Sequence, residues 1–498
     1  MNVNPITRLD YPDPDVIRVE DTYYMVSTTM HFMPGCEILQ SFDLVHWEHV
    51  TYVYETLDHT DAQQLKSGQN IYGQGMWAAS LRYHEGRFCI CFVANDTRKT
   101  YLYTSEKIDG PWKKQLIEGF YHDGSLLFDE DGRSYIVYGN DEIWITELNE
   151  DLTAPKKDGL HRLLVSDHKN PELGYEGSHI QKINGYYYIF LVHSLRDRWM
   201  RTEACFYSDS LEGEFTGGDV LCDDRGYCGQ GVAQGGIVDT PDGKWYAMLF
   251  QDSGAVGRIP ILLPVTWKDH FPFFGQNGHV PEEIEVHSTR PGYIYQPLVG
   301  SDDFCNGLLP RWQFNHDPDP RYYHLDALQG TYTITTREVC TELTQAVNTL
   351  TQRMSYPSCA AEVTVDASAL KEGDVAGLCA LQGCYAAVGI TKHHGKYEVL
   401  MLDKKEDGIL DMTEGTVVES HQMDFRLEAD FCNMKDEARC YYRVNKGDWL
   451  PIGTVHKLYF KLDHFTGCRF GLFCYAAEET GGSACFRDFK YYDVDEIS

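Results

Sequence analysis

The chain has 498 residues, 43% of them hydrophobic and 13% aromatic, so it can build more than one core, and we expect two domains. Its 43 Lys and Arg residues stand against 75 Asp and Glu residues, a formal net charge of −32 that excludes nucleic acid as an expected partner. No apolar run approaches the roughly 20 residues that cross a bilayer, and the first residues carry no export signal. We therefore expect no membrane partner and a cytoplasmic location.

The 16 cysteines are irregularly spaced and form no CxxC pairs, which argues against a structural zinc site. Most fall inside apolar segments such as RFCICFVA and RFGLFCYAA. This placement predicts buried thiols in a reducing compartment, with a disulfide framework as the alternative.

One sequence unit recurs five times in the first 250 residues. Each copy is an apolar stretch, a polar turn and an aromatic-rich stretch, which is the pattern of a β-hairpin. The copies are DPDVIRVEDTYYMV, WAASLRYHEGRFCICF, DGSLLFDEDGRSYIVYG, EGSHIQKINGYYYIFL and QGGIVDTPDGKWYAML. They recur every ~50 to 65 residues, enough for about four strands, so the repeat predicts a five-bladed β-propeller rather than a sandwich with long loops.

The first residues of the copies are Asp13, Trp77, Asp123, Glu176 and Gln234. If the hairpins are equivalent, all five lie at the start of the innermost strand of a blade, around one pocket. Three of them are carboxylic acids, which repel one another and lose hydration when gathered together. Folding gives no reason for such a cluster, so we infer a functional site, although each acid could instead cap a turn.

The pattern changes after STRPGYIYQPLVGSDDF, a stretch typical of a linker. Beyond it, segments such as AAEVTVDAS, YAAVGITKHHGKYEVLML and SACFRDFKYYDV alternate apolar and polar residues, as half-buried antiparallel strands do. We predict an all-β chain in which residues 1–290 form the catalytic propeller, 291–302 a linker and 303–498 a β-sandwich.

The motifs resemble those of glycoside hydrolase family 43, the propeller β-xylosidases and α-L-arabinofuranosidases, over essentially the whole chain. The pattern Glu-Gly-x-His-x-x-Lys-x-x-Gly-x-Tyr-Tyr of that family begins here at Glu176, and Asp-x-Ser-Leu-x-x-Asp-x-Asp-Gly begins at Asp123. The opening Pro-Asp-Pro of the family matches Pro12-Asp13-Pro14. Weaker matches are Trp77-Ala78 and Gly257-Arg258.

The resemblance implies an exo-acting, inverting hydrolase in which Asp13 is the general base, Asp123 the pKa modulator and Glu176 the general acid. It further implies that Trp77 lines the pocket and that Arg258 binds the sugar. We expect Phe32 to wall the sugar ring. The sandwich can also reach toward the pocket in relatives, but the sequence does not indicate by which residue.

The chemistry requires no cofactor. Many family members bind Ca²⁺ in the channel through a fifth-blade His, and the aligned residue here is Gln234, whose carbonyl oxygen is still a candidate ligand. A second candidate calcium site is Asp302, Asp303 and Asp488 in the sandwich.

The expected substrates are β-1,4-xylo-oligosaccharides and arabinoxylan fragments, cleaved to xylose and arabinose. The alternatives are a strict α-L-arabinofuranosidase and a non-catalytic carbohydrate-binding protein. A retaining fructosidase is disfavoured because YPDPD is not its Asn-Asp-Pro-Asn-like motif. Whether the chain forms a homo-oligomer stays open.

Overall fold

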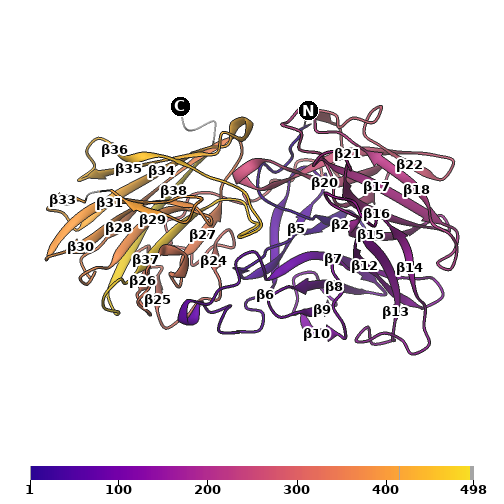
Figure 1. Cartoon of the computed structure of the whole chain (residues 1–498), viewed down its shortest axis with the longest axis horizontal. Coiled ribbons are helices and arrows are strands. Elements are labelled where there is room, and N and C mark those ends of the chain that lie inside the picture. The colour runs from indigo at the N-terminus through magenta and orange to yellow at the C-terminus, as the bar shows by residue number, and fades with distance from the viewer. Residues whose placement is uncertain (1, 414, 494–498) are drawn as a thin grey trace.

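The structure is a computed structural model that describes residues 2–413 and 415–493. Its regular secondary structure is almost entirely β-strand, in two halves that lie side by side, the first drawn in indigo to magenta and the second in orange to yellow (Figure 1). The first half is a five-bladed propeller and the second a β-sandwich, which confirms the predicted fold class. Within the described residues, no helix is suited by length and hydropathy to crossing a bilayer.

Each propeller blade is a four-stranded antiparallel sheet made from one continuous stretch of chain. The first blade consists of β2 (Asp15–Val19), β3 (Thr22–Val26), β5 (Gly35–Ser41) and β6 (Glu48–Tyr54), and the second of β7 (Met76–His84), β8 (Arg87–Ala94), β9 (Lys99–Ser105) and β10 (Lys113–Ile117). The third blade consists of β11 (Ser125–Phe128), β12 (Ser134–Asn140), β13 (Glu142–Leu148) and β14 (His161–Ser166), and the fourth of β15 (Glu176–Ile183), β16 (Tyr186–Ser194), β17 (Arg201–Ser208) and β18 (Thr216–Leu221). The fifth blade consists of β19 (Gly236–Asp239), β20 (Trp245–Asp252), β21 (Arg258–Lys268) and β22 (Phe271–Phe274). The short 3-10 helices η1 (Lys66–Gly68) and η2 (Gly254–Val256) interrupt the loops.

The repeated hairpins are the inner halves of the blades. Two of them turn through two-residue loops whose residues both have positive φ, Glu85–Gly86 at 48° and 78° and Asn184–Gly185 at 50° and 85°. Such turns match the right-handed twist of the paired strands, which explains the Asn-Gly and Glu-Gly turns in the sequence. The first strands of the blades pack against one another, β2 with β7, β7 with β11, β11 with β15 and β19 with β2.

Hydrogen bonds of one type join the innermost strands of the first four blades. In each case a backbone N–H of one blade donates to a side chain of the preceding blade. The pairs are Leu81 with Asp15 (2.7 Å), Leu126 with Ser80 (3.1 Å) and Ile180 with Ser125 (3.1 Å). The acceptors follow the first residues of the repeats by two or three positions, so the repeats are structurally equivalent, as their sequences predict.

The N-terminal segment fastens the first blade to the last. Strand β1 (Asn2–Val3) pairs with β23 (Glu283–Ile284), and the side chain of Asn4 donates to Leu262 O on β21 (2.8 Å) and accepts from Leu262 N (3.0 Å). Because the first and fifth blades share no strand among the residues that the structure describes, these contacts help to close the ring of sheets.

The sandwich consists of two antiparallel sheets. The first has the order β32 (Leu410–Met412), β31 (Lys396–Lys404), β30 (Tyr385–His393), β29 (Val375–Leu381), β37 (Arg469–Tyr475), β27 (Leu350–Arg353), β24 (Gln313–Asn315) and β4 (Phe32–Met33), with β33 (Thr416–Val418) also on β31. The second has the order β25 (Tyr323–Asp326), β26 (Thr331–Thr335), β38 (Ser483–Asp493), β28 (Ser358–Asp366), β34 (Gln422–Asp430), β35 (Glu437–Val444) and β36 (Leu450–Lys457). The 3-10 helices here are η3 (Leu343–Gln345) and η4 (Cys432–Met434).

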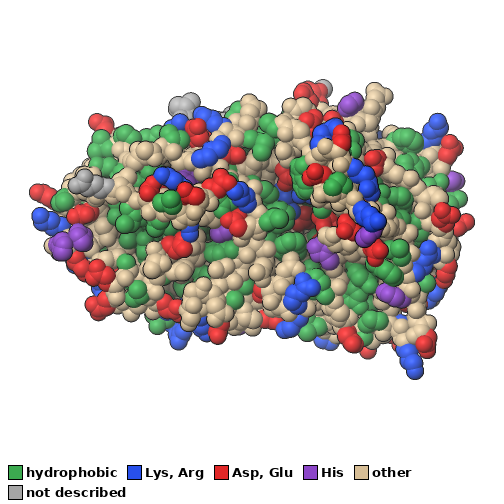
Figure 2. Space-filling view, viewed as in Figure 1, with side chains coloured by type: hydrophobic (Ala, Val, Ile, Leu, Met, Phe, Trp, Pro, Cys, Tyr) green, Lys and Arg blue, Asp and Glu red, His purple; other side chains and the backbone are tan. Residues whose placement is uncertain are grey.

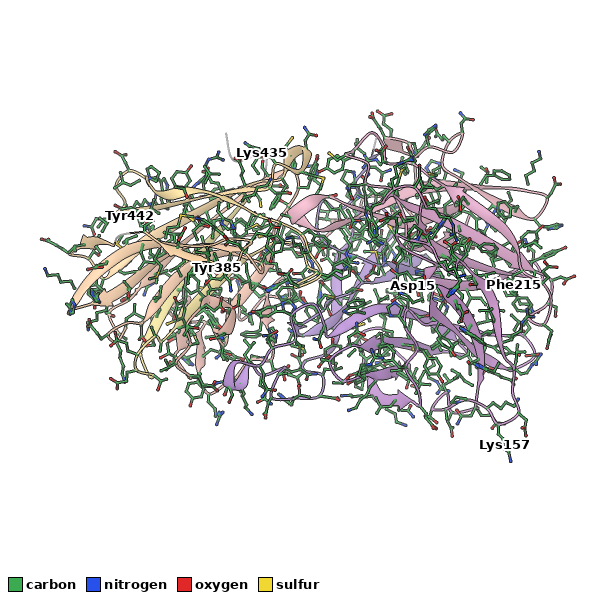
Figure 3. The ribbon with its side chains drawn as sticks, viewed as in Figure 1. Asp15, Lys157, Phe215, Tyr385, Lys435 and Tyr442 are labelled. Atoms are coloured by element: carbon green, nitrogen blue, oxygen red, sulfur yellow. The ribbon has the colours of Figure 1, made fainter. Side chains whose placement is uncertain are left out.

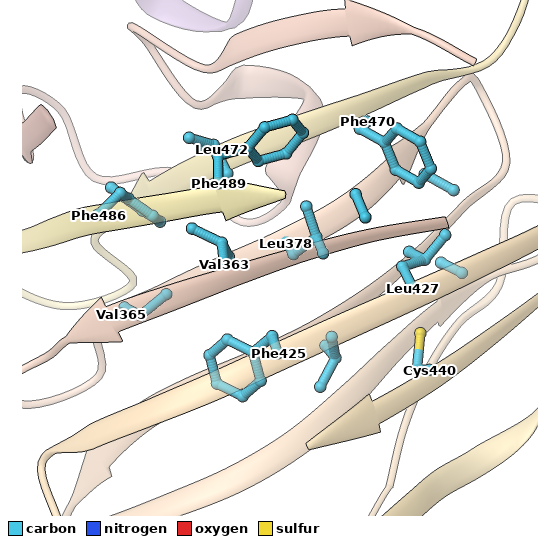
Figure 4. Close-up of a cluster of buried hydrophobic side chains, with 14 of the residues drawn as sticks. Val363, Val365, Leu378, Phe425, Leu427, Cys440, Phe470, Leu472, Phe486 and Phe489 are labelled. Carbon is cyan, nitrogen blue, oxygen red and sulfur yellow. The ribbon is translucent and has the colours of Figure 1, made fainter. Parts of the chain in front are cut away.

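The core of the sandwich lies between these sheets (Figure 4). Val363 and Phe425 from the second sheet face Leu378, Phe470 and Leu472 from the first, and all are almost completely buried. Burying such side chains stabilises a fold by about 1.5 to 3 kcal/mol each, so this core gives the second half its own hydrophobic support.

One propeller segment completes a sheet of the sandwich. Strand β4 pairs with β24, placing Phe314 opposite Met33 and Asn315 opposite Phe32. A buried ion pair between Arg353 Nη1 and Glu37 Oε2 (2.9 Å) reinforces this junction. The two halves therefore share backbone hydrogen bonds and a buried charge pair.

All 16 cysteines are free thiols and 11 of them are buried, as the sequence predicts. On the face shown in Figure 2, acidic and basic side chains are intermixed with apolar ones.

Candidate active site

The three predicted carboxylates lie at the same end of the innermost strands. Asp13 and Asp123 each stand two residues before the strand that follows them, β2 and β11, and Glu176 begins β15. Both aspartates have left-handed backbones, with φ of 52° and 47°, and are 7% and 6% exposed. Non-glycine residues rarely adopt this conformation and cluster at functional sites when they do. In Figure 3 the labelled Asp15, two residues after Asp13, lies well inside the propeller half.

Asp13 is held by a cation and a hydroxyl. Nη1 of Arg258 lies 3.0 Å from Oδ1 and 3.2 Å from Oδ2, and the Thr28 hydroxyl donates to Oδ2 (2.6 Å). The Nε and Nη2 atoms of Arg258 are buried without a hydrogen-bond partner among the described residues. Unsatisfied buried donors are costly, so these two are suited to a ligand's oxygen atoms.

Asp123 and Glu176 are joined through His122. The Nε2 atom of His122 lies 3.6 Å from Oδ2 of Asp123 and 3.5 Å from Oε2 of Glu176, while the Gly177 N–H donates to Oδ2 of Asp123 (3.0 Å). The charge of Asp123 raises the pKa of His122 to about 9, so its imidazole is protonated at neutral pH. Burial raises the pKa of Asp123 to about 6, against the attraction of His122.

Glu176 has a second partner on the same oxygen. The Asn140 side-chain amide, at the end of β12, donates to Oε2 (2.8 Å). Neither Asn140 nor His122 is predicted as a site residue from the sequence. A usable signal existed for His122, which directly precedes Asp123 in its motif, but Asn140 falls outside every recognised pattern.

The sandwich contributes two phenylalanines to the site. The centre of the Phe465 ring lies 4.2 Å from the guanidinium carbon of Arg258 and 5.6 Å from the centre of the Trp77 ring. The centre of the Phe460 ring lies 5.6 Å from that of Phe465. Phe465 also has a left-handed backbone, with φ of 55°. These are the residues by which the sandwich reaches the pocket, and nothing in the local sequence singles them out.

Asp10 fixes this sandwich loop against the propeller. Its Oδ1 accepts a hydrogen bond from the backbone N–H of Arg258 and its Oδ2 accepts one from the backbone N–H of Gly467, both at 2.8 Å. One carboxylate thus sets the position of Arg258 relative to the loop that carries Phe465.

Two other predicted site residues occupy less direct positions. Phe32 is 2% exposed and packs between His31 and Arg469 at the domain junction, so its role in walling the sugar stays a prediction. The Trp77 ring lies 6.1 Å from the ring of His122, at the edge of the carboxylate cluster.

The predicted channel calcium does not suit the residues on the axis. Gln234 is buried against Gly177, so close that a Cβ on that glycine would lie 2.4 Å from the Gln234 amide carbon. On the neighbouring innermost strands, Nη1 of Arg82 lies 2.7 Å from Oδ2 of Asp15, and Nδ1 of His179 lies 3.2 Å from Oδ1 of Asp15. Asp15 is the only carboxylate among these residues, and the Arg82 guanidinium already neutralises it. These residues therefore offer a Ca²⁺ ion, which prefers several oxygen ligands, little support.

Two further groups bear on metal binding. Asp302, one of the three predicted sandwich calcium ligands, accepts hydrogen bonds on both oxygens, from Phe304 N–H (2.7 Å) and Trp312 Nε1 (2.8 Å); the site stays a prediction. Among the residues described, His122, Asp123 and Glu176 offer donor atoms within 4.8 Å of one another. The raised pKa of His122 opposes metal binding, because a ligating imidazole must be unprotonated.

The site can be compared with known proteins. The profile described as "Glycosyl hydrolases family 43" matches residues 3–272, and that of a "Beta xylosidase C-terminal Concanavalin A-like domain" matches residues 301–492. A "Beta-xylosidase" of Formosa agariphila is 26% identical over 99% of this chain and 89% of its own. A "Xylosidase/arabinosidase 43B" of Humicola insolens is 25% identical over 98% of this chain and 96% of its own.

Solved structures agree with these sequence relatives. A "Bifunctional GH43-CE" protein of Bacteroides eggerthii is 42% identical and superposes with a TM-score of 0.93 over the whole of this chain, which spans 64% of that larger one. A GH43 glycoside hydrolase engineered to show both endo-xylanase and exo-arabinofuranosidase activity is 27% identical, with a TM-score of 0.86 and 99% coverage of both chains. The profile match over more than half of the chain identifies this protein as a glycoside hydrolase that belongs to glycosyl hydrolase family 43.

Proposed function

We propose that this glycoside hydrolase removes xylose and arabinose from the non-reducing ends of xylo-oligosaccharides and arabinoxylan fragments, with inversion at the anomeric carbon. The observation that carries the proposal is the meeting of three carboxylates from separate blades beside an arginine with two free donors. The names of the relatives, a beta-xylosidase and a xylosidase/arabinosidase, support the substrate class.

Asp13 acts as the general base. The Arg258 guanidinium and the Thr28 hydroxyl both donate hydrogen bonds to its carboxylate and hold it in place. In an inverting reaction it removes a proton from a water molecule, whose oxygen bonds to the anomeric carbon as the bond to the leaving oxygen breaks. The two unpaired donors of Arg258 bind sugar oxygens and keep the ring in line with that water.

Glu176 acts as the general acid. Because Asn140 and His122 both contact Oε2, the catalytic proton is best carried on Oε1, from which it passes to the leaving oxygen. Asp123 and His122 form an oppositely charged pair beside Glu176, and their charges set the electrostatic environment of this general acid.

The sandwich accounts for exo attack. Phe465 and Phe460 lie over the Arg258 guanidinium, and a wall of two rings there limits how much sugar can extend past the first subsite. A pocket closed in this way binds a chain end better than the middle of a polymer.

Hydrolysis of 4-nitrophenyl β-D-xylopyranoside and 4-nitrophenyl α-L-arabinofuranoside tests the proposal. We expect measurable kcat/KM for both, followed by release of xylose from xylobiose. NMR of the first-formed sugar should show the α-anomer from the β-xyloside, because inversion reverses the configuration. Absence of hydrolysis of both glycosides would refute the substrate class, and a β-anomer would refute inversion.

A localisation in the cytoplasm is part of the same proposal, since short imported oligosaccharides are then the natural substrates. Fractionation of the source cells followed by immunodetection would test it.

A further inference from the structure

We propose that Arg82 is a positioning residue that holds all three catalytic carboxylates in register from the propeller axis. Arg82 lies on β7, in the blade whose first residue is Trp77 rather than an acid. Its side chain is 13% exposed and reaches out of its own blade. The inference rests on the proposed hydrolytic function.

The guanidinium of Arg82 contacts the two strands that directly follow Asp13 and Asp123, β2 and β11, and the strand that begins at Glu176, β15. Nη1 donates to Oδ2 of Asp15 on β2 (2.7 Å), two residues after Asp13. Nη2 donates to Oγ of Ser125 on β11 (2.8 Å), two residues after Asp123, and Nε donates to Leu126 O (2.8 Å). Nη2 also donates to Ile180 O on β15 (3.2 Å), four residues after Glu176.

A planar fork with several donors is needed for this arrangement. Only a guanidinium presents hydrogen bonds in several fixed directions within one plane, whereas a lysine ammonium is a compact point charge on a flexible stem. Arg82 therefore fixes the distances among β2, β11 and β15, and not only the charge at the axis.

The remaining groups at the axis support this role. His179, three residues after Glu176, lies 3.2 Å from Oδ1 of Asp15, and Asp15 is almost completely buried. Although burial opposes ionisation, Arg82 and His179 keep the pKa of Asp15 below its usual value. The buried carboxylate of Asp15 is thus compensated by side chains of the protein itself.

Positioning at this level matters for rate. A displacement of about 1 Å among reacting groups can cost on the order of 100-fold in rate, because the carboxylates must be aligned on opposite sides of the sugar. Loss of the Arg82 contacts frees three strands at once, so kcat should fall much more than the affinity for substrate.

The far end of the axis offers a way to test this. A hollow of about 420 Å³ is lined by Arg82, Leu126 and Ile180 together with other residues of the innermost strands and Trp245 of β20, so it opens opposite the active site. A small guanidinium ion can enter there without competing with the sugar.

The experiment compares Arg82→Ala with Arg18→Ala in the full-length enzyme. Arg18 is the matched control, because it also joins two blades, from β2 to Asp239 of β19, but contacts neither β11 nor β15. For Arg82→Ala we expect a fall in kcat of roughly 10- to 100-fold with KM changed by less than about threefold, and saturable partial rescue by millimolar methylguanidinium. Sodium chloride at equal ionic strength should not rescue.

Equal kcat values for the two variants, or rescue by sodium chloride alone, would overturn the proposal. If Arg82→Ala does not fold by thermal melting, Arg82→Lys decides: a lowered kcat at a near-normal melting temperature supports the proposal, and full kcat refutes it. Failure of the proposed function is distinguishable, because the unaltered enzyme would then hydrolyse neither glycoside.

Discussion

The Nε2 atom of His122 lies 3.5 Å from Oε2 of Glu176, which places a protonated imidazole beside the proposed general acid. The same atom lies 3.6 Å from Asp123, so one positive charge serves two carboxyl groups. Removal of this charge should alter the protonation of the whole cluster, because interacting groups titrate together.

Replacement of His122 by Asn tests this coupling. The positive charge of His122 lies 3.5 Å from the proposed general acid Glu176, so its loss should move the alkaline limb of the kcat/KM profile, which reports that acid, to higher pH by roughly one unit or more. The measurement is kcat/KM for the xyloside between pH 4 and pH 10. His161→Asn, on the outer strand β14, is the control and should leave the profile in place; an unshifted His122→Asn profile would contradict the role.

Glu176→Gln removes the proposed proton donor while preserving size. General acid catalysis contributes about 10²- to 10⁴-fold, so kcat/KM for xylobiose should fall by that order. A 2,4-dinitrophenyl xyloside needs little protonation and should lose much less. Equal losses on the two substrates would assign Glu176 a different role.

Phe465→Ala should open the pocket toward the sandwich. The ring covers the Arg258 guanidinium at 4.2 Å, so its loss lets water reach this group and should raise KM for the xyloside several-fold. Activity on longer xylo-oligosaccharides relative to xylobiose should rise. Leu462→Ala, an exposed position of the same loop, is the control, and an unchanged chain-length preference in Phe465→Ala would argue against the wall.

The domain junction should be sensitive to acid. His31, His316 and His464 pack together with Tyr72, and burial lowers the pKa of all three, that of His464 to about 4. Arg469 and Lys404 oppose protonation here, while Asp463 favours it.

The direction of the pH effect follows from these values. An unfolded histidine takes up its proton near pH 6.5, before the folded one does, so stability should fall as the pH falls from about 6.5 toward 4. For His464 alone the loss is on the order of 3 kcal/mol. Thermal melting across this range should show the decline, and His464→Phe, which keeps the ring contact with Tyr72, should flatten it. Parallel curves for the two proteins would contradict this account.

Activity should not depend on calcium. Arg82 already supplies a cation beside Asp15, so dialysis against EDTA should leave kcat and the melting temperature unchanged. Addition of Ca²⁺ to the dialysed enzyme should likewise have no effect. A rise of several degrees in the melting temperature with millimolar Ca²⁺ would show that a site exists after all.

The sequence by itself determined the architecture and the principal acids. Each repeat encodes its own hairpin through local patterning and turn residues, and the repeat's period makes Asp13, Asp123 and Glu176 equivalent positions around one axis. These inferences depend on order along the chain, which a sequence records directly.

Only the tertiary structure decided what surrounds those acids. Phe465 belongs to the other domain, β4 leaves the propeller to join a sandwich sheet, and Arg82 leaves its own blade to contact three others. These contacts join residues far apart in the chain, and their side chains are of types that also occur throughout cores and surfaces. Packing and charge compensation, rather than local pattern, select them, and packing is defined only once the chain is folded.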